Sequence, residues 1–270
     1  GFIPSFTIGG MTGVMLGANV ADYQYHDTYF VVAHFHYVIV GGTVFGFFAA
    51  MHYWWPKMFG RLLNETLGKI TFWFFFTGFH LTFFVQHFLG LMGMPRRYWI
   101  FLEDQGLDLG NFISTMGTFL MGIGTIVFLI NIVVSARGEK AAADPWDGRT
   151  LEWAVSSPPP YYNFAQLPLT RGLDPLWIEK MEGNGKMIPG EPLDDIHMPN
   201  NSILPFLMSI GFFIAGIGFI YQVDHKLWYL ALYGGLAFSV GCMIVRSLQD
   251  DIGYYIPKEE LEAALEREAD

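Results

Sequence analysis

The sequence predicts an all-α membrane protein, a bundle of about six transmembrane helices with an irregular cytoplasmic linker. Of its 270 residues, 52% are hydrophobic and 26 are Phe, which is more apolar than a soluble domain of this size. Six stretches without Asp, Glu, Lys or Arg are long enough to cross a bilayer, which requires about 20 apolar residues. They are residues 1–21, 28–56, 70–95, 109–136, 201–223 and 227–245.

Basic residues gather on one side when the six stretches are placed in alternating directions. Positive-inside bias makes that side the cytoplasm. It receives Lys57, Arg61, Lys69, Arg137, Lys140, Arg149, Arg171, Lys180, Lys186 and Arg246, whereas Arg96, Arg97 and Lys226 fall outside. The net charge of −10 comes mostly from residues 139–195 and 250–270. These are solvated segments, so we expect a multi-pass protein in a lipid bilayer, with a cytoplasmic C-terminal tail and no nucleic-acid partner.

Composition divides the chain into four parts. Residues 1–137 hold four apolar stretches, and residues 138–200 form a proline-rich linker that lies on the cytoplasmic surface. Residues 201–246 hold two more apolar stretches, and residues 247–270 form an acidic tail in which charge pairs predict a short helix. The sequence starts with Gly1 rather than Met, and this residue already lies in an apolar run. We therefore expect that the protein begins further upstream.

The most informative stretch is HDTYFVVAHFHYVIVGG, residues 26–42. Ionisable side chains inside a membrane helix are costly and therefore suggest function. At about 100° per residue, His34 and His36 lie about 200° apart on one helix. They cannot share a metal ion, because a helical zinc pair needs i,i+4 spacing on one face. Two separate centres flanking the helix fit this spacing, and so do two histidines that hydrogen-bond neighbouring helices.

Other polar residues leave alternatives open. His26 beside Asp27 suits Mg²⁺ only weakly, since that ion prefers oxygen ligands, and a surface pair fits equally well. Arg96 and Arg97 fit either a solvated edge or a carboxylate-binding pair. Further polar side chains inside the third stretch are interpreted as hydrogen bonders between helices. These are His80, Gln86 and His87.

Four motifs resemble subunit I of haem–copper terminal oxidases, and the likeness runs over essentially the whole chain. They are HDTYFVVAHFHYVIVGG at 26–42, GMPRRY at 93–98, FTIGGMTGVMLGAN at 6–19 and TFFVQHFLGLMG at 82–93. The resemblance implies the C-terminal part of a subunit with twelve plus two helices, in which residues 1–137 belong to the oxidase core.

The same resemblance assigns site residues. It makes His34 the catalytic proximal ligand of a high-spin haem iron and His36 an axial ligand of a low-spin haem iron, with Phe35 between the two macrocycles. It assigns Mg²⁺ to His26 and Asp27, completed by a partner's carboxylate. It also implies that haem propionates are held by Asp22, Arg96 and Arg97.

The resemblance further implies a proton-pumping enzyme of the bacterial plasma membrane that reduces O₂ to water with electrons from cytochrome c. Both haems are expected to be haem A, and the copper ligands to lie upstream of Gly1. Expected partners are a copper-carrying subunit II, subunit III and small subunits. The segments DPWDGRTLEWAVSSPPPYYNF and TRGLDPLWIEKMEG favour the cytochrome c oxidases of Bacillus-type bacteria. A menaquinol or ubiquinol oxidase is the close alternative, and a transporter with an intramembrane histidine relay the distant one.

Overall fold

The computed structural model describes residues 1–183, 185–223, 225–249 and 253–269, and in these ranges the chain is mostly helical. Among the described residues, five helices are long and apolar enough to cross a membrane. They are Tyr29–Phe59, Glu65–Leu91, Asp108–Ser135, Leu204–Tyr221 and Trp228–Leu248. Each overlaps one of the predicted stretches, which confirms the all-α membrane class.

The first predicted stretch, residues 1–21, differs from the others. It forms the shorter apolar helix α1, Phe2–Gly17. The helix stops because Ala18 has an extended backbone with ψ 106°, and α2, Asn19–Tyr25, follows it. Among the described residues, five helices are long enough to span a bilayer, and α1 is a shorter apolar helix within the first predicted stretch.

The chain forms two compact units, one of residues 1–160 and 171–186, the other of residues 161–170 and 187–270. Of the predicted acidic tail, residues 250–252 and 270 lie outside the described residues. The four-part division drawn from composition stays a prediction.

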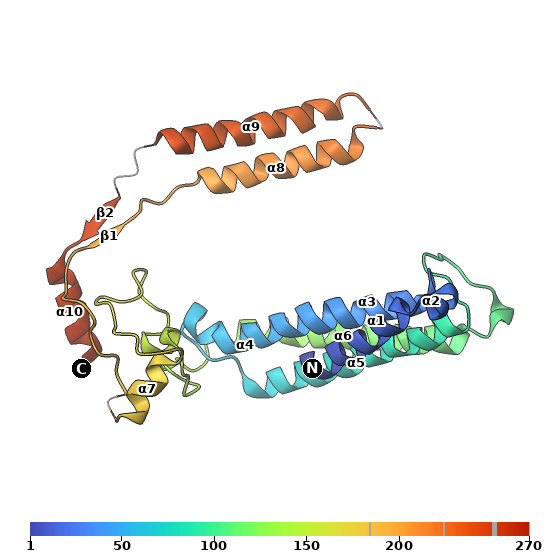
Figure 1. Cartoon of the computed structure of the whole chain (residues 1–270), viewed down its shortest axis with the longest axis horizontal. Helices are drawn as coiled ribbons and strands as arrows, with labels where there is room; N and C mark the ends of the chain where they lie inside the picture. The colour runs from blue at the N-terminus through green and yellow to red at the C-terminus, as the bar shows by residue number, and fades with distance from the viewer. Residues whose placement is uncertain (184, 224, 250–252, 270) are drawn as a thin grey trace. The chain divides into compact units, whose positions relative to one another are not determined.

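The first unit is a helix bundle in which α1, α3, α5 and α6 run side by side (Figure 1). Its longest span joins α3, Tyr29–Ile39, through the π-helical turn η1, Val40–Val44, to α4, Phe45–Phe59. The helices α5, Glu65–Leu91, and α6, Asp108–Ser135, pack along their lengths, and η2, Glu103–Gln105, lies between them in sequence. Buried aromatic rings form the core of the bundle. They are Tyr37, Phe45, Phe75 and Phe79.

Buried amide and hydroxyl groups tie the α4–α5 connection to α6. The Asn131 side chain is fully buried, and its Oδ1 accepts from the Asn64 backbone N–H at 2.9 Å while its Nδ2 donates to the Asn64 carbonyl at 3.1 Å. Ser135 Oγ donates to the same Oδ1 at 2.8 Å. These bonds satisfy the buried polar groups that the turn leaves outside the helices.

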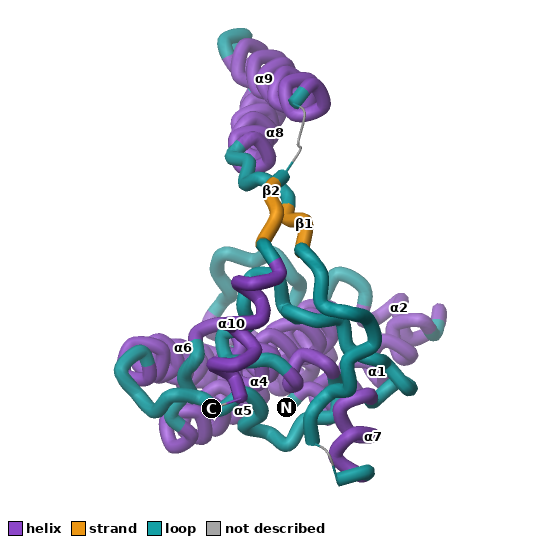
Figure 2. Tube along the Cα trace, turned by 90° about the vertical axis from the view of Figure 1, so that its left-hand side faces the viewer, coloured by secondary structure: helices purple, strands orange, loops and turns teal. Residues whose placement is uncertain are grey.

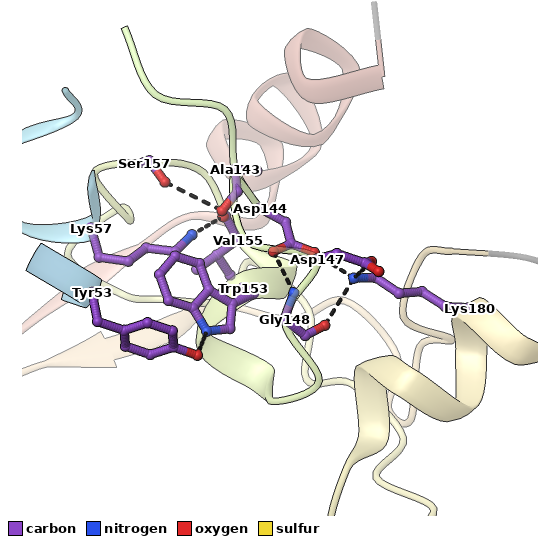
Figure 3. A network of polar contacts seen from close by, with 10 residues as sticks. All are labelled: Tyr53, Lys57, Ala143, Asp144, Asp147, Gly148, Trp153, Val155, Ser157 and Lys180. Carbon is purple, nitrogen blue, oxygen red and sulfur yellow. Dashed lines mark hydrogen bonds and ion pairs between the residues drawn. The ribbon is translucent and has the colours of Figure 1, made fainter. Parts of the chain in front are cut away.

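The linker packs on the end of α4 through contacts shown in Figure 3. Trp153, in the 3₁₀ helix η3, Leu151–Ala154, is 1% exposed and donates from Nε1 to the Tyr53 hydroxyl at 2.9 Å. The ammonium of Lys57 lies 5.3 Å from the Trp153 ring centroid and donates to the Val155 carbonyl. The linker is irregular in secondary structure, as predicted, but buried contacts fix its course.

An ion-pair cluster holds the linker together. Lys180, in α7, Pro175–Met181, donates to Asp144 Oδ2, to Asp147 Oδ1 and to the Gly148 carbonyl. Burial opposes the charged form of Asp144, but the Gly148 N–H and the Lys180 ammonium outweigh it and keep the pKa of Asp144 below its ordinary value. Burial likewise opposes the charge of Lys180, and its two carboxylate partners still raise the pKa of Lys180.

The second unit is built on the hairpin of α8, Leu204–Tyr221, and α9, Trp228–Leu248. An antiparallel pair of strands, β1, Ile196–Met198, and β2, Tyr254–Ile256, joins the segments before α8 and after α9 (Figure 2). The predicted tail helix is present as α10, Lys258–Ala269.

Candidate functional site

Both candidate ligands lie on α3, and they face different helices. Thr28 caps the start of α3 by accepting the Phe30 N–H at 3.2 Å, which sets where the helical positions begin. The His34 ring contacts α1, whereas the His36 ring stacks on Phe83 of α5 with 4.0 Å between centroids. The two imidazoles therefore lie on opposite sides of α3 within the bundle.

The ring nitrogens of these histidines have distinct roles. His34 Nδ1 lies 3.0 Å from the Gly9 carbonyl oxygen, and His36 Nδ1 lies 2.7 Å from the Val32 carbonyl oxygen. A carbonyl oxygen can only accept, so each Nδ1 donates and each Nε2 keeps its lone pair. Within the described part of the chain, neither Nε2 has a hydrogen-bond partner. A histidine that ligates a metal through Nε2 can be oriented by a carbonyl at Nδ1 in this way, so both residues fit a haem iron, although His52 has the same arrangement.

Small residues of α1 allow the close approach to His34. A Cβ on Gly9 would lie 3.0 Å from the Tyr37 carbonyl carbon, and a Cβ on Gly13 would lie 2.9 Å from His34 Cε1. Gly9 and Gly13 are one helical turn apart and therefore line one face of α1. The absence of side chains on this face brings the Gly9 carbonyl within hydrogen-bond reach of His34.

The loop after α5 places Arg96 beside the histidine helix. The Arg96 N–H donates to the Asp27 carbonyl at 2.8 Å, and Thr28 forms an isolated bridge with Pro95. As a result, the Arg96 guanidinium carbon lies 5.9 Å from the Phe35 ring centroid. Arg96 Nε is buried without a hydrogen-bond partner, and a buried guanidinium donor left unpaired is suited to a carboxylate ligand.

Arg97 differs from its neighbour. It has a left-handed backbone with φ 68°, its side chain is exposed, and no partner for its guanidinium occurs among the residues that the structure describes. The two arginines therefore differ in burial, because the Arg96 side chain is partly buried and the Arg97 side chain is exposed.

The N-terminal end of α3 gathers Asp22, His26 and Asp27. His26 Nδ1 lies 3.4 Å from Asp22 Oδ2, and His26 Nε2 lies 3.7 Å from Asp27 Oδ2. The side chains of His26 and Asp27 are 70% and 62% exposed. In the described ranges, no three His, Cys, Asp or Glu side chains could hold a metal ion together. A magnesium site here would need further ligands from outside these residues.

The remaining polar side chains of α5 pair mostly as predicted. The Tyr37 hydroxyl lies 2.6 Å from His80 Nδ1, and Gln86 donates to Ser114 Oγ of α6 at 3.0 Å, so His80 and Gln86 bond between helices. His87 differs, because its Nδ1 lies 3.2 Å from the Phe84 carbonyl of its own helix.

Several contact residues were not identified from the sequence. They are Gly9, Thr12, Gly13 and Phe83. The spacing of Gly9 and Gly13 was a usable signal for a close helix contact, but nothing in the sequence said which helix would make that contact.

Comparison with known proteins relates the chain to an oxidase family. The family model described as Cytochrome C and Quinol oxidase polypeptide I matches residues 1–120. Cytochrome c oxidase subunit 1 of Bacillus subtilis (strain 168) is 62% identical over 262 residues, which cover 96% of this chain and 42% of that protein. Residues 1–120 therefore match the cytochrome c and quinol oxidase polypeptide I family, and 96% of the chain is similar to an oxidase subunit 1.

Further relatives of the chain show two levels of similarity. Cytochrome c oxidase subunit 1 of Bacillus sp. (strain PS3) is also 62% identical, over 96% of this chain and 42% of that protein. Quinol oxidase subunit 1 of Bacillus subtilis is 47% identical, over 96% of this chain and 40% of that protein. The chain thus spans less than half the length of these relatives. The resemblance to haem–copper oxidase subunit I is confirmed, including its preference for Bacillus-type cytochrome c oxidases.

Proposed function

We propose that this chain is part of the catalytic subunit of a proton-pumping terminal oxidase that reduces O₂ to water with electrons from cytochrome c. The observation that carries the proposal is the pair of imidazoles on opposite sides of α3, each oriented by a carbonyl at Nδ1 with Nε2 unpaired. In this assignment His34 ligates the high-spin haem iron at which catalysis occurs, and His36 ligates the low-spin haem iron.

When bound, the haems together with copper supply the electron transfer and the oxygen reduction. The residues of this chain orient and hold these groups. The Gly9 carbonyl accepts the His34 Nδ1 proton and so sets both the tautomer and the ring plane of that ligand. Phe35 lies between the two ligands in sequence and contacts the Arg96 guanidinium, and these contacts support our assignment of its ring to the space between the two haems.

Charged groups at the outer end are assigned to the haem propionates and to a cation. Arg96 would donate from its buried, unpaired Nε to a propionate, Arg97 would supply a second positive charge, and Asp22 would share one proton with a propionate of the high-spin haem. We assign Mg²⁺ to His26 and Asp27, with a carboxylate from a partner subunit, because these two residues alone do not form a complete site.

The proposal extends to cofactors, partners and location. We assign haem A to both haem sites and place the copper ligands in the part of the relatives that this chain does not span. Subunit II carrying copper, subunit III and small subunits are the proposed partners. The basic residues flanking the spans favour a bacterial plasma membrane location with the linker and the tail in the cytoplasm.

A menaquinol or ubiquinol oxidase is the alternative within the family. The relatives named as cytochrome c oxidase are 62% identical to the chain and the quinol oxidase of Bacillus subtilis is 47% identical, which favours cytochrome c as the donor. Turnover of the purified complex with reduced cytochrome c, and none with a quinol, is the expected result. The reverse result would reassign the donor. The relatives named here are all oxidase subunits, so we set the transporter interpretation aside.

The ligand assignment is tested by removing each imidazole from the full-length protein. His36→Ala should remove the low-spin haem spectrum and leave a CO-binding high-spin haem, and His34→Ala should do the opposite. His52→Ala is a matched control, because His52 also donates from Nδ1 to the carbonyl four residues earlier, Phe48, at 2.8 Å. Equal loss of both haems from either variant, or haem loss from the control, would contradict separate ligation.

A further inference from the structure

Phe83 lies flat against the imidazole of His36. The two ring centroids are 4.0 Å apart and the planes differ by 14°. The hydrogen bond from His36 Nδ1 to the Val32 carbonyl, 2.7 Å long, holds one edge of the ring. An edge contact alone leaves the ring free to rock about that bond, whereas a stacked neighbour fixes the plane. Together the two contacts leave the imidazole one orientation.

The position of Phe83 is itself fixed by packing. The helix α5 lies close to α3 at its outer end, because a Cβ on Gly90 would lie 2.1 Å from the Phe30 nitrogen. The Phe83 ring is half-buried, and its centroid lies 5.3 Å from that of Phe79, which is fully buried. A ring backed by the core cannot swing away from His36 without opening a void, which close-packed interiors resist.

We propose that Phe83 is a positioning residue for the low-spin haem, acting by fixing the plane of its His36 ligand. This inference rests on the proposed function. The direction of an imidazole plane over a porphyrin determines how it overlaps the iron d orbitals, and thereby the splitting of those orbitals in the low-spin ferric state. The contacts that orient a ligand tune the metal as well as hold it. A tightly packed residue next to a metal ligand restricts the ligand's movement to a few tenths of an ångström, the precision that functional sites require.

The test is electron paramagnetic resonance of the low-spin ferric haem in the full-length protein, purified as its membrane complex. Phe83→Leu and Phe83→Met both keep an apolar side chain but lose the flat ring, so at least one is expected to accumulate normally. Phe84→Leu is the matched control, because Phe84 is the next residue on α5, is 46% exposed, and contacts His87 rather than His36. Phe83→Tyr restores an aromatic face.

We expect the largest g value of the low-spin signal to shift in Phe83→Leu and Phe83→Met. It should stay unchanged in Phe84→Leu and return to the wild-type value in Phe83→Tyr. Unchanged g values in both Phe83 variants, or an equal shift in the control, would overturn the inference. Failure of the proposed function is a different result, namely a wild-type complex without a low-spin haem signal, or a signal that survives His36→Ala.

Discussion

Replacing Gly13 by Ala should displace the ring of His34. The added Cβ would lie 2.9 Å from His34 Cε1, whereas carbon atoms pack favourably at about 3.5 Å or more. The ring must then move by about 0.6 Å. It is held by the Gly9 carbonyl at 3.0 Å, so the movement weakens that hydrogen bond. Such overpacking costs about 1–3 kcal/mol, and loss of an orienting contact lowers metal affinity by about 10- to 100-fold.

The assay separates the two haems. Reduced-minus-oxidised spectra quantify both haems, and CO difference spectra report the high-spin haem. We expect Gly13→Ala to lose CO-binding haem and to keep the low-spin haem, because His36 faces α5 rather than α1. Gly10→Ala is the matched control, since it makes the same substitution in the same helix and its Cβ would contact nothing within 4 Å. In both variants the change from Gly to Ala stabilises the helix by about 1 kcal/mol, so this effect cancels in the comparison.

Two outcomes would refute this reasoning. Retention of CO-binding haem in Gly13→Ala at the level of Gly10→Ala would mean that α1 does not restrain His34. Equal loss of both haems in Gly13→Ala would mean that the substitution disrupts the bundle rather than one ligand.

Three further predictions follow from contacts elsewhere in the first unit. Asn131→Leu removes both hydrogen bonds from the Asn131 amide to the Asn64 backbone and the acceptor of the buried Ser135 hydroxyl, so thermal unfolding should show a destabilisation of about 1–3 kcal/mol, and an unchanged midpoint would contradict it. Arg96→Ala should shift the haem midpoint potentials in a redox titration while protein abundance changes little, because in the proposed function it removes a propionate partner rather than a core contact. The folded protein holds the pKa of Asp144 below the ordinary aspartate pKa of about 3.9. The ionised side chain therefore stabilises the linker fully above a pH of about 3.9, and this stabilisation is lost as the pH falls through the lowered pKa. Hydrogen exchange of residues 144–157, corrected for intrinsic rates, should accelerate on acidification in wild type and lose this pH dependence in Asp144→Asn.

The sequence determined the spans and the relation between the two candidate ligands. Apolar composition is a local property, so five stretches were recognised as long membrane helices without knowledge of their neighbours. The angle between His34 and His36 follows from helix geometry alone. The end of α1 at Gly17 was not predicted, because no charged residue occurs before Asp22.

Only the tertiary structure decided which groups surround these ligands. The carbonyl that orients His34 comes from Gly9 on another helix, and the ring on His36 comes from Phe83. Arg96 reaches Phe35 because two loops pair at the outer end of the bundle. The physical reason is that covalent geometry fixes relations within one helix, whereas contacts between helices depend on how their faces pack, and many segments of similar apolar composition could supply such a face.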